Sequence, residues 1–193
     1  SLPCTVYACG TAGYGTTQEL LILQQYIDTI KPNRVILEVC NNDFVDNDWN
    51  LEKRCNYIVG QTRPYLLLND KIEYHYPRSW FEHVKEYSLF LNYIFGHGYT
   101  IALALNMAER DRPFEEIVAD SANFNFKNTI ALTENALRKI NETVEAHGAM
   151  LYVFDADRYE PGRTIFSELC KKNNIAYITG VADEISNREM AGD

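Results

Sequence analysis

Apolar side chains recur with the spacing of an α-helix along several stretches of the chain. In the first stretch, Leu20, Leu23 and Ile27 share one face, and the preceding residues Thr16 to Glu19 have the Thr-x-x-Glu spacing of a helix start. A later pattern of this kind ends at Gly148, a residue typical of helix ends. Helices are therefore predicted over residues 17–30, 79–95, 127–147 and 164–173.

Short runs of apolar and β-branched residues separate these helices. The clearest run, from Arg34 to Cys40, is typical of a buried strand in a parallel sheet. Two shorter pieces on either side of Asn69-Asp70 predict a β-hairpin, which we expect to be peripheral. Strands are predicted over residues 5–8, 34–40, 65–68, 72–76, 149–154 and 175–178. Because strands alternate with helices, the predicted fold class is α/β with a doubly wound parallel sheet.

Length and composition limit the domain count and the partners. The 193 residues, 46% of them hydrophobic, are expected to form one domain over residues 1–193, with an insert over about 50–125. Lys and Arg number 18 against 27 Asp and Glu, and the net charge of −9 argues against nucleic acid as a partner. No apolar run approaches the roughly 20 residues that span a bilayer, so the chain as given is not expected to cross a membrane.

The cysteines do not indicate a metal site. The five are scattered, with no Cys-x-x-Cys pair and no histidine at metal-ligand spacing. We interpret Cys9, Cys40 and Cys170 as small core residues, and expect neither a metal nor an organic cofactor.

Two polar loops follow predicted strands, at the end of the sheet where open α/β proteins bind ligands. The first contains Gly10, Gly13 and Gly15, which demand a tight turn. Their spacing departs from Gly-x-Gly-x-x-Gly, and no P-loop lysine follows. Alone, these glycines fit a simple turn as well as a site. The second loop, Asn41-Asn42-Asp43, favours a site.

Together the two loops resemble the second and third conserved blocks of the SGNH (GDSL-like) hydrolases, a family of esterases and acyltransferases. The matching residues are Gly13, within residues 11–19, and Asn42, within residues 40–43. The resemblance implies a flavodoxin-like, three-layer α/β/α fold with a small hairpin and helical insert. It also implies that the Gly13 backbone N–H and the Asn42 amide form an oxyanion hole, because such donors stabilise the charge that develops during acyl transfer.

The chain departs from this family pattern at three points. Cys40 stands where the third block usually has glycine. The first block, a strand running into Gly-Asp-Ser with the nucleophilic serine, has no counterpart in the chain as given. The histidine of the last block is also missing, and Asp193 is the expected aspartate that would orient it.

The missing first strand has a physical consequence. The implied sheet order places it between residues 5–8 and 34–40, which would otherwise stand roughly 9.5 Å apart with both facing edges unpaired. We therefore expect that another polypeptide segment, or residues outside the given sequence, supply this strand.

Other polar and aromatic residues have structural interpretations. Asp43 is expected to support the second loop through hydrogen bonds to backbone N–H groups, and Asp155 and Asp157 to cap a loop. Trp49 and Trp80 suit packing at least as well as a carbohydrate site. The histidines are expected at a hairpin, a helix face, a turn and a helix end: His75, His83, His97 and His147.

The leading hypothesis is an SGNH-type serine hydrolase or O-acyltransferase that acts on a small-molecule or carbohydrate ester, with an acetylated carbohydrate as the first candidate. Two alternatives stay open: a non-catalytic binding module on the same scaffold, and a nucleotide- or flavin-binding flavodoxin-like domain. An extracytoplasmic or membrane-anchored location is favoured for the full-length protein, and the oligomeric state is open.

Overall fold

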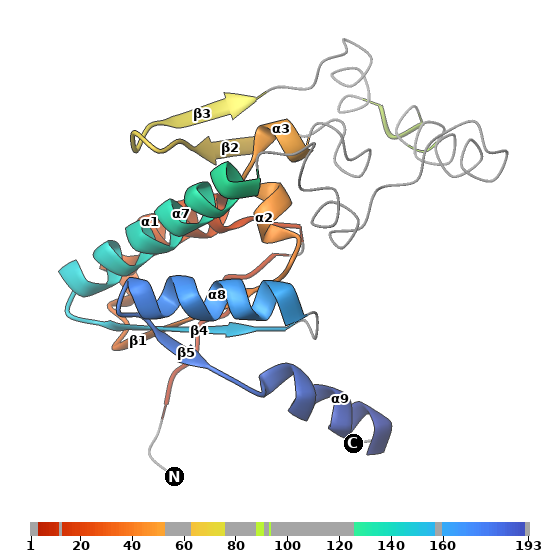
Figure 1. Cartoon of the computed structure of the whole chain (residues 1–193). Helices are drawn as coiled ribbons and strands as arrows, with labels where there is room; N and C mark the ends of the chain where they lie inside the picture. Colours follow the sequence, from red (N-terminus) through yellow and green to blue (C-terminus); the bar gives the residue numbers. More distant parts are fainter. Residues whose placement is uncertain are drawn as a thin grey trace, which may run out of the picture.

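The computed structural model describes residues 4–11, 13–52, 63–75, 88–90, 93, 126–156 and 160–191 (Figure 1). The helices are α1 (Thr16–Ile30), α2 (Asp43–Asp46), α3 (Trp49–Glu52), α7 (Phe126–Ala146), α8 (Glu160–Lys172) and α9 (Val181–Ala191). The strands are β1 (Arg34–Val39), β2 (Arg63–Leu66), β3 (Ile72–His75), β4 (Met150–Asp155) and β5 (Ala176–Ile178).

The main sheet is parallel and has the strand order β1-β4-β5. Arg34 lies opposite Met150 and Val39 opposite Asp155, so β1 and β4 pair along their whole length. Tyr152 lies opposite Ala176 in the shorter pairing of β4 with β5. The predicted mixed α/β fold with a parallel sheet is confirmed, and these three strands lie within one residue of their predicted bounds.

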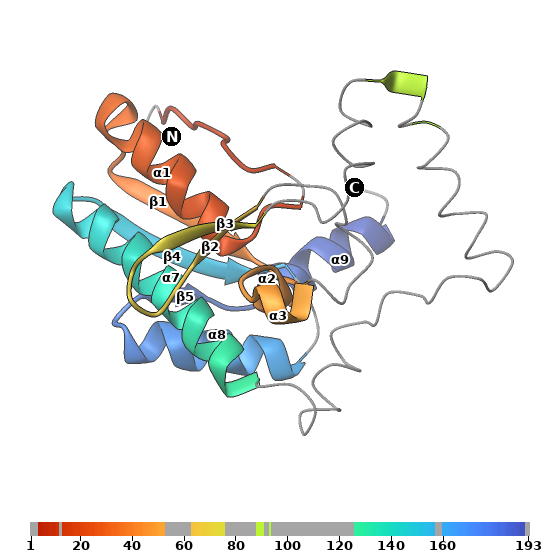
Figure 2. The ribbon, with the colours of Figure 1, turned by 90° about the horizontal axis from the view of Figure 1, so that it is seen from above.

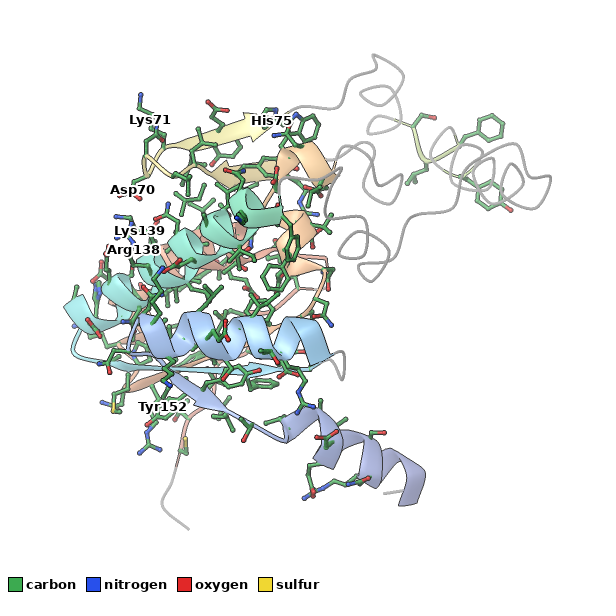
Figure 3. The ribbon with its side chains drawn as sticks, viewed as in Figure 1. Asp70, Lys71, His75, Arg138, Lys139 and Tyr152 are labelled. Carbon is green, nitrogen blue, oxygen red and sulfur yellow. The ribbon has the colours of Figure 1, made fainter. Side chains whose placement is uncertain are left out.

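One face of this sheet is covered by helices and the other is largely bare. Figures 1 and 2 show α1, α7 and α8 on the same side, with α9 on the opposite side in Figure 1. Leu37 and Val153 point into the core beneath the three helices. On the other face, Ile36 is 65% exposed and Met150 57% exposed, and Tyr152 projects away from the helices (Figure 3). The described residues therefore cover this second face only in part.

The predicted strand over residues 5–8 is wrong for this structure. The segment carries no strand, and Val6 is 81% exposed. Its apolar, β-prone residues match a strand pattern, yet a strand needs a hydrogen-bonded neighbour. Within the described part of the chain, neither β1 nor any other strand pairs with this segment.

The hairpin is present, but its predicted peripheral position is wrong for β2. β2 and β3 pair antiparallel, with Arg63 opposite His75. All four residues of β2 are buried, because the hairpin lies across α1 and α7 on the side away from the sheet (Figure 1). An ion pair between the Lys139 Nζ and Asp70 Oδ2 atoms, at 2.7 Å, fastens its turn to α7 (Figure 3).

The remaining helices agree with the prediction in part. α1 and α7 lie within one residue of their predicted bounds, whereas α8 begins four residues earlier than residue 164. The sequence patterns did not predict α9, or the two short helices after β1. Within the helix predicted over residues 79–95, the structure describes only residues 88–90 and 93, of which 89, 90 and 93 are helical. Most of the insert falls outside the described residues.

Candidate functional site

The Asn42 loop, which we define as residues 40–48 and which includes α2, begins where β1 ends. Cys40 donates its backbone N–H to Asp43 Oδ2 (2.8 Å), and Asp43 donates its own N–H to the Cys40 carbonyl (3.0 Å). This is the backbone support expected of Asp43, which is buried. Asn42 follows at the amino end of α2 with helical backbone angles, and its side chain is exposed.

The glycine loop leads into α1. Gly13 is exposed and has a φ of +82°, a conformation that favours glycine. Gly15 then caps α1, and its N–H donates to Gln18 Oε1 at 3.1 Å. The helix start is therefore fixed by Gly15 and Gln18, and the expected pairing of Thr16 with Glu19 is wrong.

The two loops meet. A Cβ atom added to Gly15 would lie 2.8 Å from the Cβ of Asp46, so the glycine permits a close approach. Asn47 donates from Nδ2 to the hydroxyls of Thr16 (3.0 Å) and Thr133 (3.3 Å), and its Oδ1 accepts from the Thr17 N–H (3.3 Å). These buried contacts join the Asn42 loop to α1 and α7 and hold it in one position.

A buried charge cluster contacts the Asn42 loop through Asp46. It consists of Arg63, Asp46, Glu52 and Tyr65, and we call it the Arg63 cluster. The Arg63 Nη1 atom lies 2.7 Å from Glu52 Oε1, and Nη2 lies 3.7 Å from Asp46 Oδ2. Arg63 Nη2 also donates to Gln18 Oε1 (2.9 Å), and the Tyr65 hydroxyl donates to Glu52. The hairpin strand β2 thus reaches both loops through one side chain.

In this cluster, the Arg63 guanidinium is the cation beside two buried carboxylates, those of Asp46 and Glu52. Burial raises the pKa of Glu52 to about 7, against the opposing effects of the Tyr65 hydrogen bond and the Arg63 charge. Burial also raises the pKa of Asp46, whereas Arg63 and the hydrogen bond from Asn42 lower it. The cluster therefore takes up a proton more readily than exposed carboxylates do.

The predicted oxyanion residues have different surroundings. Asn42 donates from Nδ2 to Asp46 Oδ2 at 2.9 Å, so its amide has a defined orientation. Gly13 lies two residues before the close contact between Gly15 and Asp46, at the surface. The structure brings their two loops together, while Asp193 lies outside the described residues.

The described histidines make structural contacts. His75 stacks on Trp49, with ring centroids 4.5 Å apart and an interplanar angle of 16°. His147, at the end of α7, contacts the Thr143 carbonyl (2.7 Å) and Asp28 (3.2 Å). His83, His97 and Trp80 lie outside the described residues.

Asp155 closes the end of β4. It is buried, accepts a hydrogen bond from the Tyr177 hydroxyl and lies 3.4 Å from Arg163 Nε. Arg163 also donates to Asp183 at 3.3 Å, so Asp155 helps to join β5, α8 and α9. These contacts are made to side chains and not to loop N–H groups, so they do not bear out the expected loop cap, and Asp157 lies outside the described residues.

Sequence reasoning missed the Arg63 cluster. One signal was present, because Asp46 stands four residues after Asn42, the spacing that brings side chains together on a helix. Arg63 and Glu52 belong to the stretch interpreted as an insert, and no sequence pattern connects them with the loop. Of the cysteines interpreted as core, Cys170 is buried, but Cys9 is exposed and Cys40 half-buried.

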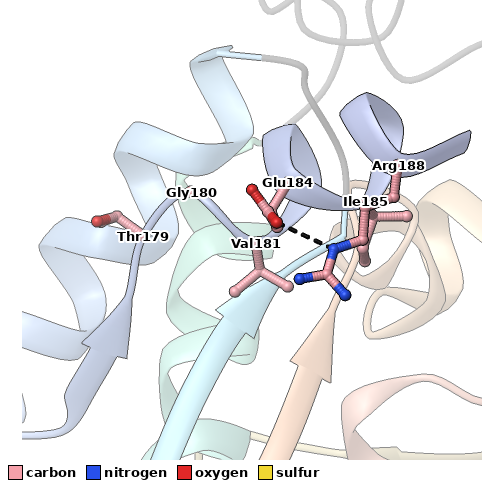
Figure 4. Close-up of a pocket in the computed structure, with 6 residues that line it drawn as sticks. All are labelled: Thr179, Gly180, Val181, Glu184, Ile185 and Arg188. Atoms are coloured by element: carbon pink, nitrogen blue, oxygen red, sulfur yellow. Dashed lines mark hydrogen bonds and ion pairs between the residues drawn. The ribbon is translucent and has the colours of Figure 1, made fainter. Parts of the chain in front are cut away.

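Other features of the described residues add little to the site. A hollow at the carboxyl end of β5 is lined by Thr179, Gly180, Val181, Glu184, Ile185 and Arg188 (Figure 4). The Glu184–Arg188 ion pair, at 2.9 Å, lies on its wall. Over the described ranges there is no His, Cys, Asp and Glu cluster of metal-binding size, and no helix that is long and apolar enough to cross a membrane.

The described residues thus place a hydrogen-bonded polar loop beside a glycine turn at one end of a parallel sheet. Comparison of the chain with protein-family models, with curated proteins and with solved structures finds no match.

Proposed function

We propose that the chain is the α/β core of an SGNH-type serine hydrolase or O-acyltransferase. The substrate would be an ester, with an acetylated carbohydrate as the first candidate. The observation that carries the proposal is that the glycine loop and the Asn42 loop, about 30 residues apart in sequence, pack together at the carboxyl end of β1. This is the position at which open α/β sheets bind their ligands.

The proposed chemistry needs two donors that point to one oxygen. A serine attacks the ester carbonyl, a histidine accepts the serine proton, and an aspartate, for which Asp193 is the candidate, orients the histidine. The Gly13 N–H and the Asn42 amide would then donate to the oxyanion that forms. Their support comes from the exposed position of both residues and from the buried contacts that fix the Asn42 loop, because fixed donors need no reorganisation during reaction.

At the edge of β1 that faces away from β4, the described part of the chain has no paired strand, and the proposed serine could enter there. The carbonyls of Asn33 and Val39 accept hydrogen bonds from the β4 side, and alternate residues of a parallel strand bond to the same neighbour. The peptide groups of Arg34, Ile36 and Glu38 therefore face away from β4, where no described strand pairs with them. A parallel strand added here would end beside Asn42, and a serine at its carboxyl end would lie at the site.

The test measures ester hydrolysis by the protein purified from its native source, so that any segment or partner that carries the serine is retained. Variant Asn42→Ala should lower kcat by about 10²- to 10³-fold, since it removes one oxyanion donor. The matched control is Asn187→Ala, an exposed asparagine of α9, which should leave kcat unchanged. A serine-directed phosphonate probe should label the active preparation.

Two results would replace the proposal. Absence of both turnover and probe labelling, together with saturable binding of an acetylated oligosaccharide, would identify a non-catalytic binding module. A thermal shift with ATP or flavin mononucleotide and none with esters would identify a nucleotide-binding domain.

A further inference from the structure

Among the described residues, the side chain of Asn42 forms a hydrogen bond with one neighbour, Asp46. Asp46 lies one helical turn further along α2, its N–H donates to the Asn42 carbonyl (2.9 Å), and its Oδ2 accepts from the Asn42 Nδ2 (2.9 Å). Asn42 is exposed, whereas Asp46 is only 7% exposed. The carboxylate therefore holds the amide from the buried side and leaves its outer side toward solvent.

Asp46 is itself fixed from two directions. Gly15 packs against its Cβ atom, where any larger residue would collide. Arg63 Nη2 lies 3.7 Å from Asp46 Oδ2 and donates to Gln18 Oε1 at 2.9 Å. Because Arg63 is 2% exposed and also pairs with Glu52, the guanidinium has little freedom to turn. The contacts from Arg63 to Asp46 to Asn42 thus form a continuous chain from β2 to the surface.

We infer that Asp46 and Arg63 are positioning residues, which fix the Asn42 amide so that one N–H binds Asp46 and the other is directed to a ligand oxygen. An asparagine amide has two N–H donors and one carbonyl acceptor, and a carboxylate accepts only from the nitrogen side. Asp46 therefore prevents the amide from flipping, and Arg63 keeps Asp46 in place. The inference deepens the proposed oxyanion role of Asn42 and rests on it.

The test follows the Asn42 side-chain amide by NMR in the ¹⁵N-labelled chain, with the signal assigned as the one lost in Asn42→Asp. In the unaltered protein, the two amide protons should exchange with water at rates that differ about tenfold or more, because one is bound to a buried carboxylate. In Asp46→Asn the difference should disappear. In Arg63→Lys, which keeps the charge but loses the planar fork, it should shrink.

The matched control is Asp48→Asn. Asp48 is a buried carboxylate of the same loop, but it accepts from the Thr129 hydroxyl (2.7 Å) and the Asn50 N–H (2.9 Å). A general loosening of the loop would alter the Asn42 amide in both variants, whereas positioning predicts a change in Asp46→Asn alone. Equal changes in both variants, or equal exchange of the two protons in the unaltered protein, would overturn the inference. The latter measurement decides the matter even if Asp46→Asn does not fold.

This readout requires neither a substrate nor a nucleophile, so it separates the inference from the proposed function. A held amide without any ester hydrolysis would overturn the proposed function and leave the contact from Asp46 to Asn42 standing. Hydrolysis with a freely turning amide would overturn the positioning role alone. In the ester assay, Asp46→Asn should lower kcat about tenfold at unchanged KM, since it affects the transition state more than substrate binding.

Discussion

Two glycines beside the Asn42 loop are required because neither position has room for a side chain. Gly15 has a φ of −95°, which any residue adopts, but a Cβ atom there would lie 2.8 Å from Asp46 Cβ and 3.4 Å from Arg63 Nη2. Gly162 of α8 also lacks room for a side chain, because a Cβ atom there would lie 1.5 Å from Asn41 Oδ1. The Asn42 loop is thus packed between two glycines, one before α1 and one in α8.

We predict that Gly15→Ala destabilises the fold by about 1–3 kcal/mol, the usual cost of forcing an extra methyl group into a packed site. The control is Gly10→Ala, because nothing lies within 4 Å of a Cβ atom at Gly10. The measurement is the free energy of unfolding in urea for both variants. Equal stability of Gly15→Ala and the unaltered protein would contradict the close approach of the two loops.

Two buried carboxylates should make stability depend on pH. Burial raises the pKa of Glu52 from 4.5 to about 7, and burial and the charge of Glu38 raise that of Glu19 from 4.5 to about 8. Between the unfolded and folded values, the folded chain keeps a proton that the unfolded chain has lost. Raising the pH therefore favours unfolding through these windows, by at most about 1.4 kcal/mol per pH unit for each group.

We accordingly predict that the free energy of unfolding falls as the pH rises from about 4.5, and levels off above the folded pKa values. Glu52→Gln should reduce the slope up to about pH 7, and Glu19→Gln should reduce it up to about pH 8, because each removes the contribution of one group. Glu168→Gln, at an exposed position of α8, is the control and should leave the slope unchanged. Urea titrations across this pH range measure the effect, and a double variant with the same slope as the unaltered protein would refute it.

At the scale of elements, β1 has two unlike edges. Its odd-numbered peptide groups face β4, and Arg34, Ile36 and Glu38 face the edge without a described partner. Cys40 stands on the same side as these three, and its peptide group is taken by Asp43 instead. The peptide group that follows this edge is thus hydrogen-bonded within the Asn42 loop.

We predict that the backbone amides of Ile36 and Glu38 exchange with deuterium at least about tenfold faster than those of Val35 and Leu37 in the chain as given, since only the latter pair bonds to β4. Residue-resolved hydrogen exchange measures this. Addition of a segment that pairs with this edge as a further parallel strand, as the proposed function expects, should remove the difference. Equal protection of all four amides without such a segment would show that the edge is already paired.

At the same scale, sequence patterns predicted elements where local and tertiary forces agree. The apolar period of α1 and α7 and the β-branched run of β1 coincide with the face or strand that the core buries. Residues 5–8 show the limit, because their pattern describes a strand but cannot provide its neighbour. The burial of β2 was likewise unpredictable, since it depends on the hairpin folding over α1 and α7.

For the whole molecule, the sequence predicted the mixed α/β fold, its parallel sheet and the two polar loops, but not the contacts that hold these loops together. Gly13 and Asn42 were singled out because the loops that contain them resemble conserved blocks of a known family. The contacts of Arg63 with Asp46 and Glu52 join segments that only the three-dimensional fold brings together, and an arginine in a short strand has no distinguishing pattern. Supporting residues of a site are therefore harder to predict than the residues that they support.

The contacts of Asn47 also bear on the stage of synthesis at which the two loops can take up their arrangement. Its amide bonds to Thr16 and to Thr133, a residue 86 positions further along the chain. During synthesis the ribosome therefore releases the glycine loop and the Asn42 loop well before the helix that fastens them. Closing so long a loop is slow and entropically costly, so a nascent chain that ends before α7 contains every residue of the two loops without their arrangement. We therefore expect the two loops to take up this arrangement only after α7 has been synthesised.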